Sequence, residues 1–337
     1  MAWGAVALIV LSACGTSNAQ PPPSPTAVAQ EVAEGPRTAE IAEHDVNPIV
    51  EDPAPELPVT VKSFDGVDVK VTDVSRIVTV DMYGTLTETV FSLGLGDNVV
   101  GRDTSSDFPA AADVPIVTVG GHDLSAESIL DLDPSVVLTD TTIGPREVQE
   151  QLRQAGIPVV YFDPERTLDG IPEFIMDVAT TLGIPDAGTQ LVERTEQELD
   201  AALELSTHVA NPPRIAFLYM RGAAGVYLLG GPGSGADDLI SAVGGIDVGT
   251  EIGLERPFTQ MTSEAMISAS PDVILVMSDG LESVGGIEQM LQMPGIAQTP
   301  AAAGRRIIDM ADTELLTFGA RSGQTVRALA EALYDHH

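Results

Sequence analysis

The chain has 337 residues, of which 44% are hydrophobic and 20% charged, a composition that can support one large or two medium globular domains. Its 16 Lys and Arg residues stand against 50 Asp and Glu residues, which gives a formal net charge of −34 at pH 7. So acidic a surface repels nucleic acid and anionic membranes, and a single cysteine excludes an internal disulfide or a metal cage built from several thiolates.

An apolar run, residues 2–13, ends at Cys14. The run is too short to span a bilayer and suits the apolar segment of a signal peptide, and Leu11-Ser12-Ala13-Cys14 resembles a bacterial lipobox. We therefore expect residues 1–14 to be a lipoprotein signal and Cys14 to be lipidated as the mature N-terminus. The alternative is a short buried strand with a chance cysteine. No Lys or Arg precedes Arg37, which departs from the usual basic start of a signal peptide.

Residues 15–58 hold nine of the 24 prolines, with eight acidic residues and one basic residue. This composition has little apolar periodicity and predicts an extended, self-repelling tether. Such a tether behind a lipid anchor would hold a folded domain away from the outer face of the cytoplasmic membrane.

From residue 59 the chain alternates between short β-branched runs and helical stretches. The predicted strands are 76–81, 114–119, 134–140 and 157–163, and the predicted helices include 84–96 and 145–156. Alternating strands and helices indicate a parallel sheet covered on both faces. We expect residues 59–184 to form an N-terminal αβ lobe.

Residues 187–207 form one long helical pattern without Gly or Pro after Gly188, and we assign 185–210 to a linking helix. A second αβ lobe, 211–337, follows it. Its predicted strands are 214–220, 272–279 and 305–310, and its predicted helices lie near 233–243, 262–269 and 321–335. A single helix makes a stiff connection, so large hinge closure is not expected.

The two lobes share a short internal sequence repeat. Glu127 lies seven residues before Pro134, and Glu264 lies seven residues before Pro271; each glutamate is near a helix start and each proline opens an apolar strand. Repetition of this unit indicates two lobes of like topology. The predicted fold is therefore α/β, with two Rossmann-like lobes joined by one long rigid helix and a ligand cleft between them.

Several enzyme motifs are excluded by the sequence. The only lysines are Lys62 and Lys70, which rules out a Walker A loop, and no G-x-S-x-G elbow occurs. The glycine run 230–237 lacks the dinucleotide spacing and predicts a tight strand-to-helix turn near a ligand. Four histidines are poorly placed, in the predicted tether, after the long helix or at the chain end: His44, His208, His336 and His337. His122 is the one histidine well placed for a site.

These features together resemble the substrate-binding lipoproteins of ABC importers for iron complexes and cobalamin, over residues 59–335. Residues 81–109, 119–130 and 218–240 are most similar to the haem-binding lipoproteins of actinobacterial haem importers. The resemblance implies an extracytoplasmic, lipid-anchored protein without catalytic turnover. It would bind ferric haem b and deliver it to an ABC permease and its ATPase, with cell-surface haem-binding proteins as candidate donors.

The resemblance also implies roles for individual residues. His122 and Tyr219 would coordinate the iron from opposite faces of the porphyrin, and Arg221 would donate a hydrogen bond to the Tyr219 oxygen. Ferric iron favours a phenolate, and a neighbouring guanidinium stabilises the phenolate over the phenol. Glu127 and Glu264 would dock onto arginines of the two permease subunits.

Local patterns support this set independently. His122 follows the predicted strand 114–119 and precedes a helix, at the carboxyl end of a strand, where open αβ sheets bind ligands. Tyr219 and Arg221 are two residues apart on one strand, so both side chains face the same way. The alternatives are a solvated turn histidine and a core tyrosine, with Tyr227 as a rival ligand.

The cleft should be partly apolar to accept a porphyrin. Candidate lining residues are Met82, Tyr83, Met220, Phe258 and Met261, and Thr85 or Arg256 are candidates for the propionates. A ferric siderophore or cobalamin carrier on the same scaffold is the alternative function. One well-placed histidine is too few for free zinc or manganese, and an enzyme such as a haem-degrading or nitrogenase-like protein would need ligands or a nucleophile that are missing.

Overall fold

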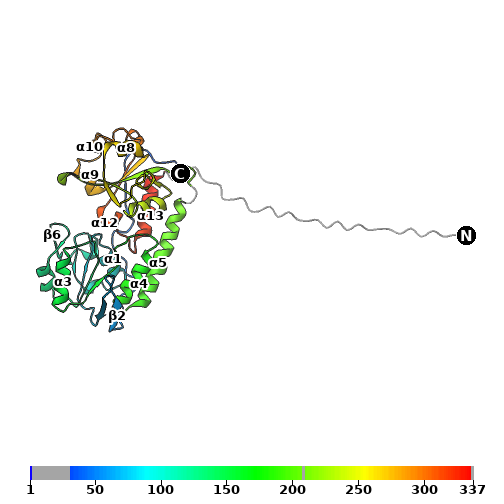
Figure 1. Ribbon diagram of the computed structural model, residues 1–337. Coiled ribbons are helices and arrows are strands. Elements are labelled where there is room, and N and C mark those ends of the chain that lie inside the picture. Colours follow the sequence, from blue (N-terminus) through cyan, green and yellow to red (C-terminus); the bar gives the residue numbers. More distant parts are fainter. Residues whose placement is uncertain (2–30, 207–208, 335–337) are drawn as a thin grey trace.

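The computed structural model of the protein describes Met1, residues 31–206 and residues 209–334 (Figure 1). They form two αβ lobes joined by helix α5 (Pro185–Leu203), which confirms the predicted fold class. Cys14 with its lipobox, residues 15–30, His208, His336 and His337 lie outside the described residues. Within the described residues, no helix is long and apolar enough to cross a membrane.

The N-terminal lobe contains a parallel sheet of four strands in the order β5-β4-β8-β9. The strands are β4 (Ile77–Val80), β5 (Val99–Arg102), β8 (Val136–Thr139) and β9 (Val159–Tyr161), and the helices are α1 (Thr85–Ser92), α2 (Ala126–Asp131), α3 (Arg146–Gln154) and α4 (Ile171–Thr181). Alternate strand residues pack on opposite faces: Ile77 joins the core under α1 and α4, whereas Val78 joins the core under α2 and α3. Every residue of β4 and β8 is therefore buried.

The C-terminal lobe has a mixed sheet in the order β1-β15-β14-β10-β11-β13, with β12 beside β10. Its strands are β1 (Arg37–Ala39), β10 (Arg214–Arg221), β11 (Val226–Gly230), β12 (Ile246–Asp247), β13 (Phe258–Gln260), β14 (Val273–Met277) and β15 (Ile307–Met310). Its helices are α6 (Ala236–Ala242), α7 (Val248–Glu251), α8 (Ser263–Ala269), α9 (Ser278–Ser283), α10 (Ile287–Met290), α11 (Pro300–Gly304), α12 (Asp312–Leu315) and α13 (Ser322–Leu333). β11 and β13 are antiparallel additions that the strand-helix alternation did not predict.

The repeated unit has the same local structure in both lobes. Ser125 caps α2 and Thr262 caps α8, each accepting a hydrogen bond from a backbone N–H three residues later. Both segments then pass through a left-handed residue, Asp133 at φ 44° and Ser270 at φ 43°, directly before the proline. The internal sequence repeat thus corresponds to a structural repeat.

The predicted strand 114–119 is mostly wrong. Its residues follow the edge of β5 through one bridge, Arg102 to Ile116, and only β6 (Thr118–Val119) is a strand, paired antiparallel with β7 (Asp123–Leu124). Gly120 and Gly121 have φ of 58° and 104°, and this left-handed backbone turns the chain back at once. His122 therefore lies in a short hairpin rather than directly after a sheet strand.

The predicted tether does not extend to residue 58. β1 pairs parallel with β15, and Ala39, Ile41 and Val46 are buried. The physical reason is that these apolar residues cover a lobe surface and β1 occupies the otherwise open edge of β15. A further hairpin, β2 (Val59–Lys62) with β3 (Asp68–Val71), follows before the N-terminal sheet begins.

Helix α5 packs against α4 of one lobe and α13 of the other, and Figure 1 shows it running along both lobes. The linking helix ends at Leu203 rather than at the predicted residue 210, and a short 3-10 turn, Glu204–Ser206, follows it. Direct hydrogen bonds also join the lobes: Thr317 Oγ1 donates to the Tyr83 carbonyl at 2.9 Å, and the Leu168 N–H donates to Asp238 at 2.6 Å. The lobes are thus connected at several places besides α5.

Candidate ligand-binding site

One cavity of about 400 Å³ is lined by residues of both lobes. The N-terminal lobe contributes Met82, Tyr83, Thr104, Ser105 and His122, and the C-terminal lobe contributes Tyr219, Arg221, Leu228, Phe258, Met277, Asp279, Asp312, Thr313 and Leu316. The cavity therefore brings together the three residues that the sequence predicted for one site. A larger cavity of about 590 Å³, between β2 and α4, is lined by none of the three.

His122 reaches the cavity from the hairpin of β6 and β7. Its Nδ1 atom is buried and has no hydrogen-bond partner among the described residues. Burial, and after it the charge of Arg221, lowers the pKa of His122, while Asp123 opposes that change. The imidazole is therefore neutral at pH 7, the form that binds metals. A buried polar atom without a partner costs about 1–3 kcal/mol, which a bound ligand can recover.

Tyr219 and Arg221 both face the cavity from the carboxyl end of β10, as period-two alternation predicted. The Arg221 guanidinium carbon lies 4.6 Å from the centroid of the Tyr219 ring, and the Phe258 ring meets that ring edge-on at 6.0 Å. The hydrogen bonds of Arg221 differ from the predicted one to the Tyr219 oxygen. Its Nη1 donates to the Met220 carbonyl at 2.8 Å and its Nη2 to Asp312 Oδ2 at 2.6 Å.

The rival ligand Tyr227 belongs to the other face of the sheet. It is opposite Met220 in the β10–β11 register, and both side chains pack in the core on the face away from Tyr219. Of the other predicted lining residues, Met82, Tyr83 and Phe258 line the cavity. Met220 and Thr85 are buried in the lobe cores, Met261 packs on the core beside Tyr227, and Arg256 is not part of the lining.

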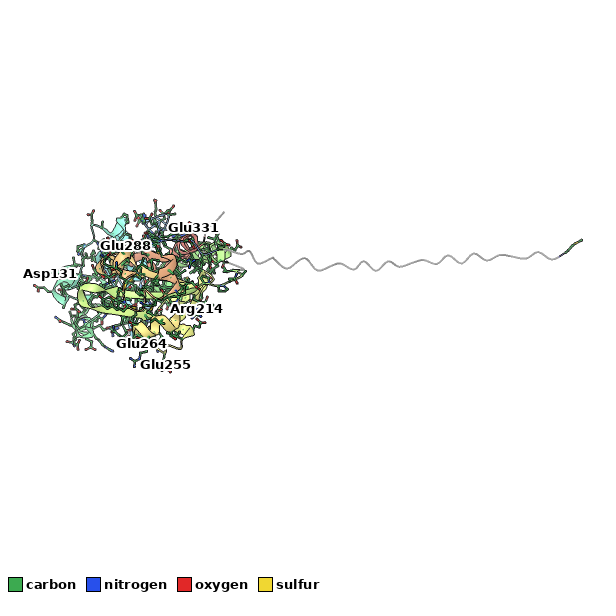
Figure 2. All side chains as sticks on the ribbon, turned by 90° about the horizontal axis from the view of Figure 1, so that it is seen from above. Asp131, Arg214, Glu255, Glu264, Glu288 and Glu331 are labelled. Atoms are coloured by element: carbon green, nitrogen blue, oxygen red, sulfur yellow. The ribbon has the colours of Figure 1, made fainter. Side chains whose placement is uncertain are left out.

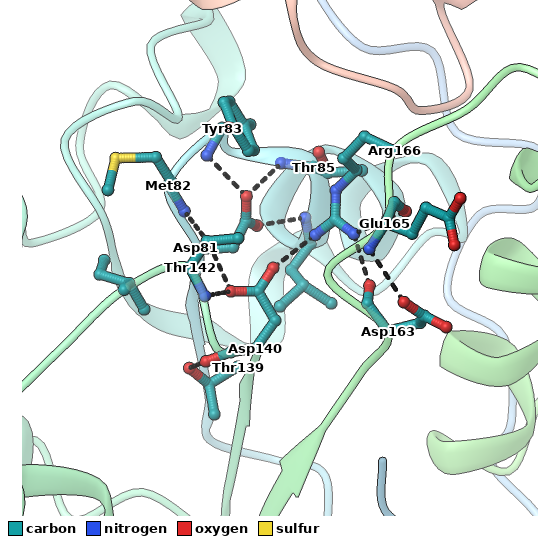
Figure 3. Close-up of polar contacts among 12 residues, drawn as sticks. Asp81, Met82, Tyr83, Thr85, Thr139, Asp140, Thr142, Asp163, Glu165 and Arg166 are labelled. Atoms are coloured by element: carbon teal, nitrogen blue, oxygen red, sulfur yellow. Dashed lines mark hydrogen bonds and ion pairs between the residues drawn. The ribbon is translucent and has the colours of Figure 1, made fainter. Parts of the chain in front are cut away.

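A buried polar network fixes the cavity wall at Met82 and Tyr83 (Figure 3). The Asp81 carboxylate accepts hydrogen bonds from the backbone N–H groups of Tyr83 and Leu86, both at 2.8 Å. The Met82 N–H donates to Thr142 Oγ1 at 3.0 Å. Asp81 is fully buried, so these bonds form in a medium of low dielectric constant, where they hold the backbone firmly.

Two more buried aspartates belong to this network. Asp140 pairs with Arg166 at 2.6 Å, and Asp103 accepts hydrogen bonds from backbone N–H groups including that of Asp81. Burial and the charge of Asp81 raise the pKa of Asp103 to about 8. The same two causes raise the pKa of Asp140 to about 6, against the charge of Arg166.

These carboxyl groups should make the protein less stable as the pH rises from about 4 to about 8. An unfolded aspartate loses its proton near pH 4, at its ordinary pKa of about 3.9. The folded protein keeps protons on these groups to higher pH, so stability is lost as the pH rises from the unfolded value to the folded values. We expect the free energy of unfolding to fall as the pH rises from about 4 to about 8, by at most about 1.4 kcal/mol per pH unit for each proton; the contribution of Asp140 ends near pH 6 and that of Asp103 near pH 8. Urea unfolding at each pH measures this free energy. Asp103→Asn should flatten the slope, and equal slopes in both proteins would contradict the prediction.

Glu127 and Glu264 are both exposed in the first turns of their helices, α2 and α8. Glu264 lies at the periphery of the molecule (Figure 2). Their side chains are thus free to meet a partner, and their equivalence follows from the structural repeat.

Residues 80–313 match the periplasmic binding protein family. The chain belongs to this family. It is accordingly a binding protein rather than an enzyme. Among the described residues, no group of three or more His, Cys, Asp or Glu side chains is arranged to hold a metal ion.

Three known proteins are similar to this chain. The heme binding protein HmuT, known from a crystal structure, is 41% identical in sequence to this chain. The two structures have a TM-score of 0.86, and the match covers 90% of this chain and 98% of HmuT. Solved variants of HmuT replace a histidine, a tyrosine and an arginine with alanine. An uncharacterized ABC transporter substrate-binding lipoprotein of Bacillus subtilis, YvrC, is 24% identical over 82% of this chain and 86% of its own. The vitamin B12-binding protein of Vibrio cholerae is 26% identical over 56% of this chain and 66% of its own.

Proposed function

We propose that this binding protein captures haem in the cavity between its lobes, with His122 and Tyr219 as the axial ligands of the iron. The observation that carries the proposal is the lining of that cavity. It combines a neutral imidazole from the N-terminal lobe, whose buried nitrogen has no hydrogen-bond partner in the described part of the chain, with a phenol beside a guanidinium from the C-terminal lobe. The likeness to HmuT at 41% identity supports haem as the ligand class.

The chemistry of these groups suits ferric haem b. Ferric iron is a hard cation that favours a phenolate ligand, and the positive Arg221 guanidinium lies beside the Tyr219 ring. Apolar side chains at the same cavity, such as Met82, Phe258 and Leu316, offer contacts for the faces of a porphyrin. The variants of HmuT at a histidine, a tyrosine and an arginine concern the same three residue types.

A ferric siderophore or cobalamin is the second candidate ligand, because the vitamin B12-binding protein is a more distant relative. A siderophore carries its own iron ligands, so it would need neither His122 nor Tyr219. The unpartnered nitrogen of His122 therefore favours haem.

The remaining parts of the proposal concern location and delivery. Cys14 would be lipidated after removal of the signal, and the residues that follow it would tether the lobes to the outer face of the cytoplasmic membrane. The lipoprotein YvrC supports this arrangement. Glu127 and Glu264 would present equivalent charges to the two halves of an ABC permease with its ATPase, after haem capture from cell-surface donor proteins.

Titration with hemin tests the proposal. The wild-type protein should bind one equivalent with a defined Soret band and leave the haem chemically unchanged. His122→Ala removes one axial ligand, so it should shift the band and weaken binding by at least about tenfold. His44→Ala is the matched control, because His44 is exposed and pairs with Glu314 outside the cavity. Hemin spectra that are indifferent to His122→Ala, with tight binding of cobalamin, would overturn the proposal.

A further inference from the structure

Arg221 has a partner that the sequence did not suggest. Its Nη2 atom donates to Asp312 Oδ2 at 2.6 Å, and both residues line the cavity. Asp312 is 91 positions away along the chain and only 14% exposed, whereas Arg221 is 35% exposed. The pair therefore lies at the wall of the candidate haem site, beside the proposed iron ligand.

Sheet topology explains why these residues meet. β10, β14 and β15 are neighbouring parallel strands, so their carboxyl ends reach the same edge of the sheet. Arg221 ends β10, Asp279 lies two residues after β14, and Asp312 lies two residues after β15. The Asp279 N–H donates to Asp312 Oδ1 at 2.9 Å, which leaves Oδ2 directed at the guanidinium.

The guanidinium is held on several sides. Nη1 donates to the Met220 carbonyl at 2.8 Å, Nη2 to Asp312, and the guanidinium carbon lies 4.6 Å from the Tyr219 ring centroid. α9 approaches it through Gly280, where a Cβ atom would lie 3.0 Å from the Met220 carbonyl oxygen and 3.3 Å from Arg221 Nη1. Of these contacts, the one to Asp312 is made by two charged side chains, which is the stronger kind of hydrogen bond.

We propose that Asp312 is a positioning residue for the iron site: it holds the Arg221 guanidinium against Tyr219, so that the guanidinium stabilises the iron-bound phenolate. This inference rests on the proposed haem function. Asp312 does not touch the iron in this scheme, and its whole effect on binding passes through Arg221. Without the carboxylate, the Arg221 guanidinium would keep one of these two hydrogen bonds, to the Met220 carbonyl, and the long side chain could turn toward solvent.

Asp312→Asn is the direct test, because it keeps the acceptor for the Asp279 N–H and places an amide where Oδ2 met Arg221. We expect hemin affinity to fall by roughly 3- to 30-fold, the usual size of coupling between contacting residues. The visible absorption band that depends on ligation of the ferric iron by Tyr219 should also weaken. Asp312→Glu should restore part of both signals, which a general loss of folding would not do.

Two comparisons separate this role from other effects. Asp65→Asn is the matched control, because it also removes the carboxylate of an Asp–Arg ion pair, with Arg153 at 2.5 Å and the same 14% exposure, but Asp65 does not line the cavity. In an Arg221→Ala background, Asp312→Asn should have less than about a twofold further effect, since the residue acts through Arg221.

The outcomes are distinguishable. If the hemin complex of the wild type has no absorption band that is lost on substitution of Tyr219, both the proposed function and this inference are overturned. If the wild-type complex has that absorption band but Asp312→Asn is indistinguishable from Asp65→Asn, the inference alone is overturned. The same holds if Asp312→Asn acts equally strongly with and without Arg221.

Discussion

Tyr219→Phe should weaken hemin binding by more than the roughly 10- to 100-fold that is typical when a residue outside the coordination shell is lost, because it removes an iron ligand itself. The substitution takes away only the hydroxyl group. The ring can keep its stacking under Arg221 and its edge contact with Phe258 at 6.0 Å. The loss therefore reports coordination rather than packing.

Visible absorption and a hemin titration measure the effect. The band that depends on phenolate ligation should disappear in Tyr219→Phe, while the far-ultraviolet circular dichroism stays that of the wild type. Tyr227→Phe is the matched control, because Tyr227 is in the adjacent strand and packs on the opposite face of the sheet. If both variants bind hemin like the wild type, Tyr219 is not a ligand.

Most of the fold could be predicted from the sequence because its signals are local. β4 and β8 are β-branched runs buried on both faces, and α5 is a long pattern without glycine or proline in its later part. The pairing of Tyr219 with Arg221 needed only the period of a strand. Each of these features is determined within a few residues of itself.

The features that were missed depend on contacts distant along the chain. β1 looked like part of an acidic tether, and it becomes a strand only because β15 presents an open edge to it. Asp312 reaches Arg221 because β14 pairs with β10 and β15 pairs with β14 in the sheet, although the two residues are 91 positions apart along the chain. The hairpin at His122 depends on two glycines with positive φ, which a count of β-branched residues overlooks.

The largest stability effect is expected at a buried ion pair between the lobes. Glu88 of α1 is 2% exposed and Arg321, just before α13, is 11% exposed; Arg321 Nη2 lies 2.8 Å and Nε 2.9 Å from Glu88 Oε2. The backbone N–H of Arg321 donates to Glu88 Oε1 at 3.1 Å, and Nη1 donates to the His44 carbonyl at 2.9 Å. One carboxylate thus joins the N-terminal lobe to the start of the last helix.

Arg321→Met should cost about 3–5 kcal/mol in the free energy of unfolding, because it leaves the buried Glu88 carboxylate without the guanidinium that balances its charge. Glu88→Gln added to Arg321→Met should recover part of that loss, since no unpaired charge remains. Arg305→Met is the control: it breaks an exposed pair with Glu288, and exposed ion pairs contribute little to stability because solvent screens them. Urea unfolding of the four proteins measures these values. Equal costs for Arg321→Met and Arg305→Met would show that the interlobe pair is not a major connection.

The same pair bears on ligand binding, because the proposed axial ligands belong to different lobes. His122 is carried by the N-terminal lobe and Tyr219 by the C-terminal lobe, so their separation depends on how firmly the lobes are joined. In Arg321→Met, hemin binding should therefore weaken even at temperatures where the protein remains folded, whereas Arg305→Met should bind as the wild type does. Unchanged hemin affinity in folded Arg321→Met would mean that α5 and the remaining interlobe hydrogen bonds suffice to hold the two ligands in register.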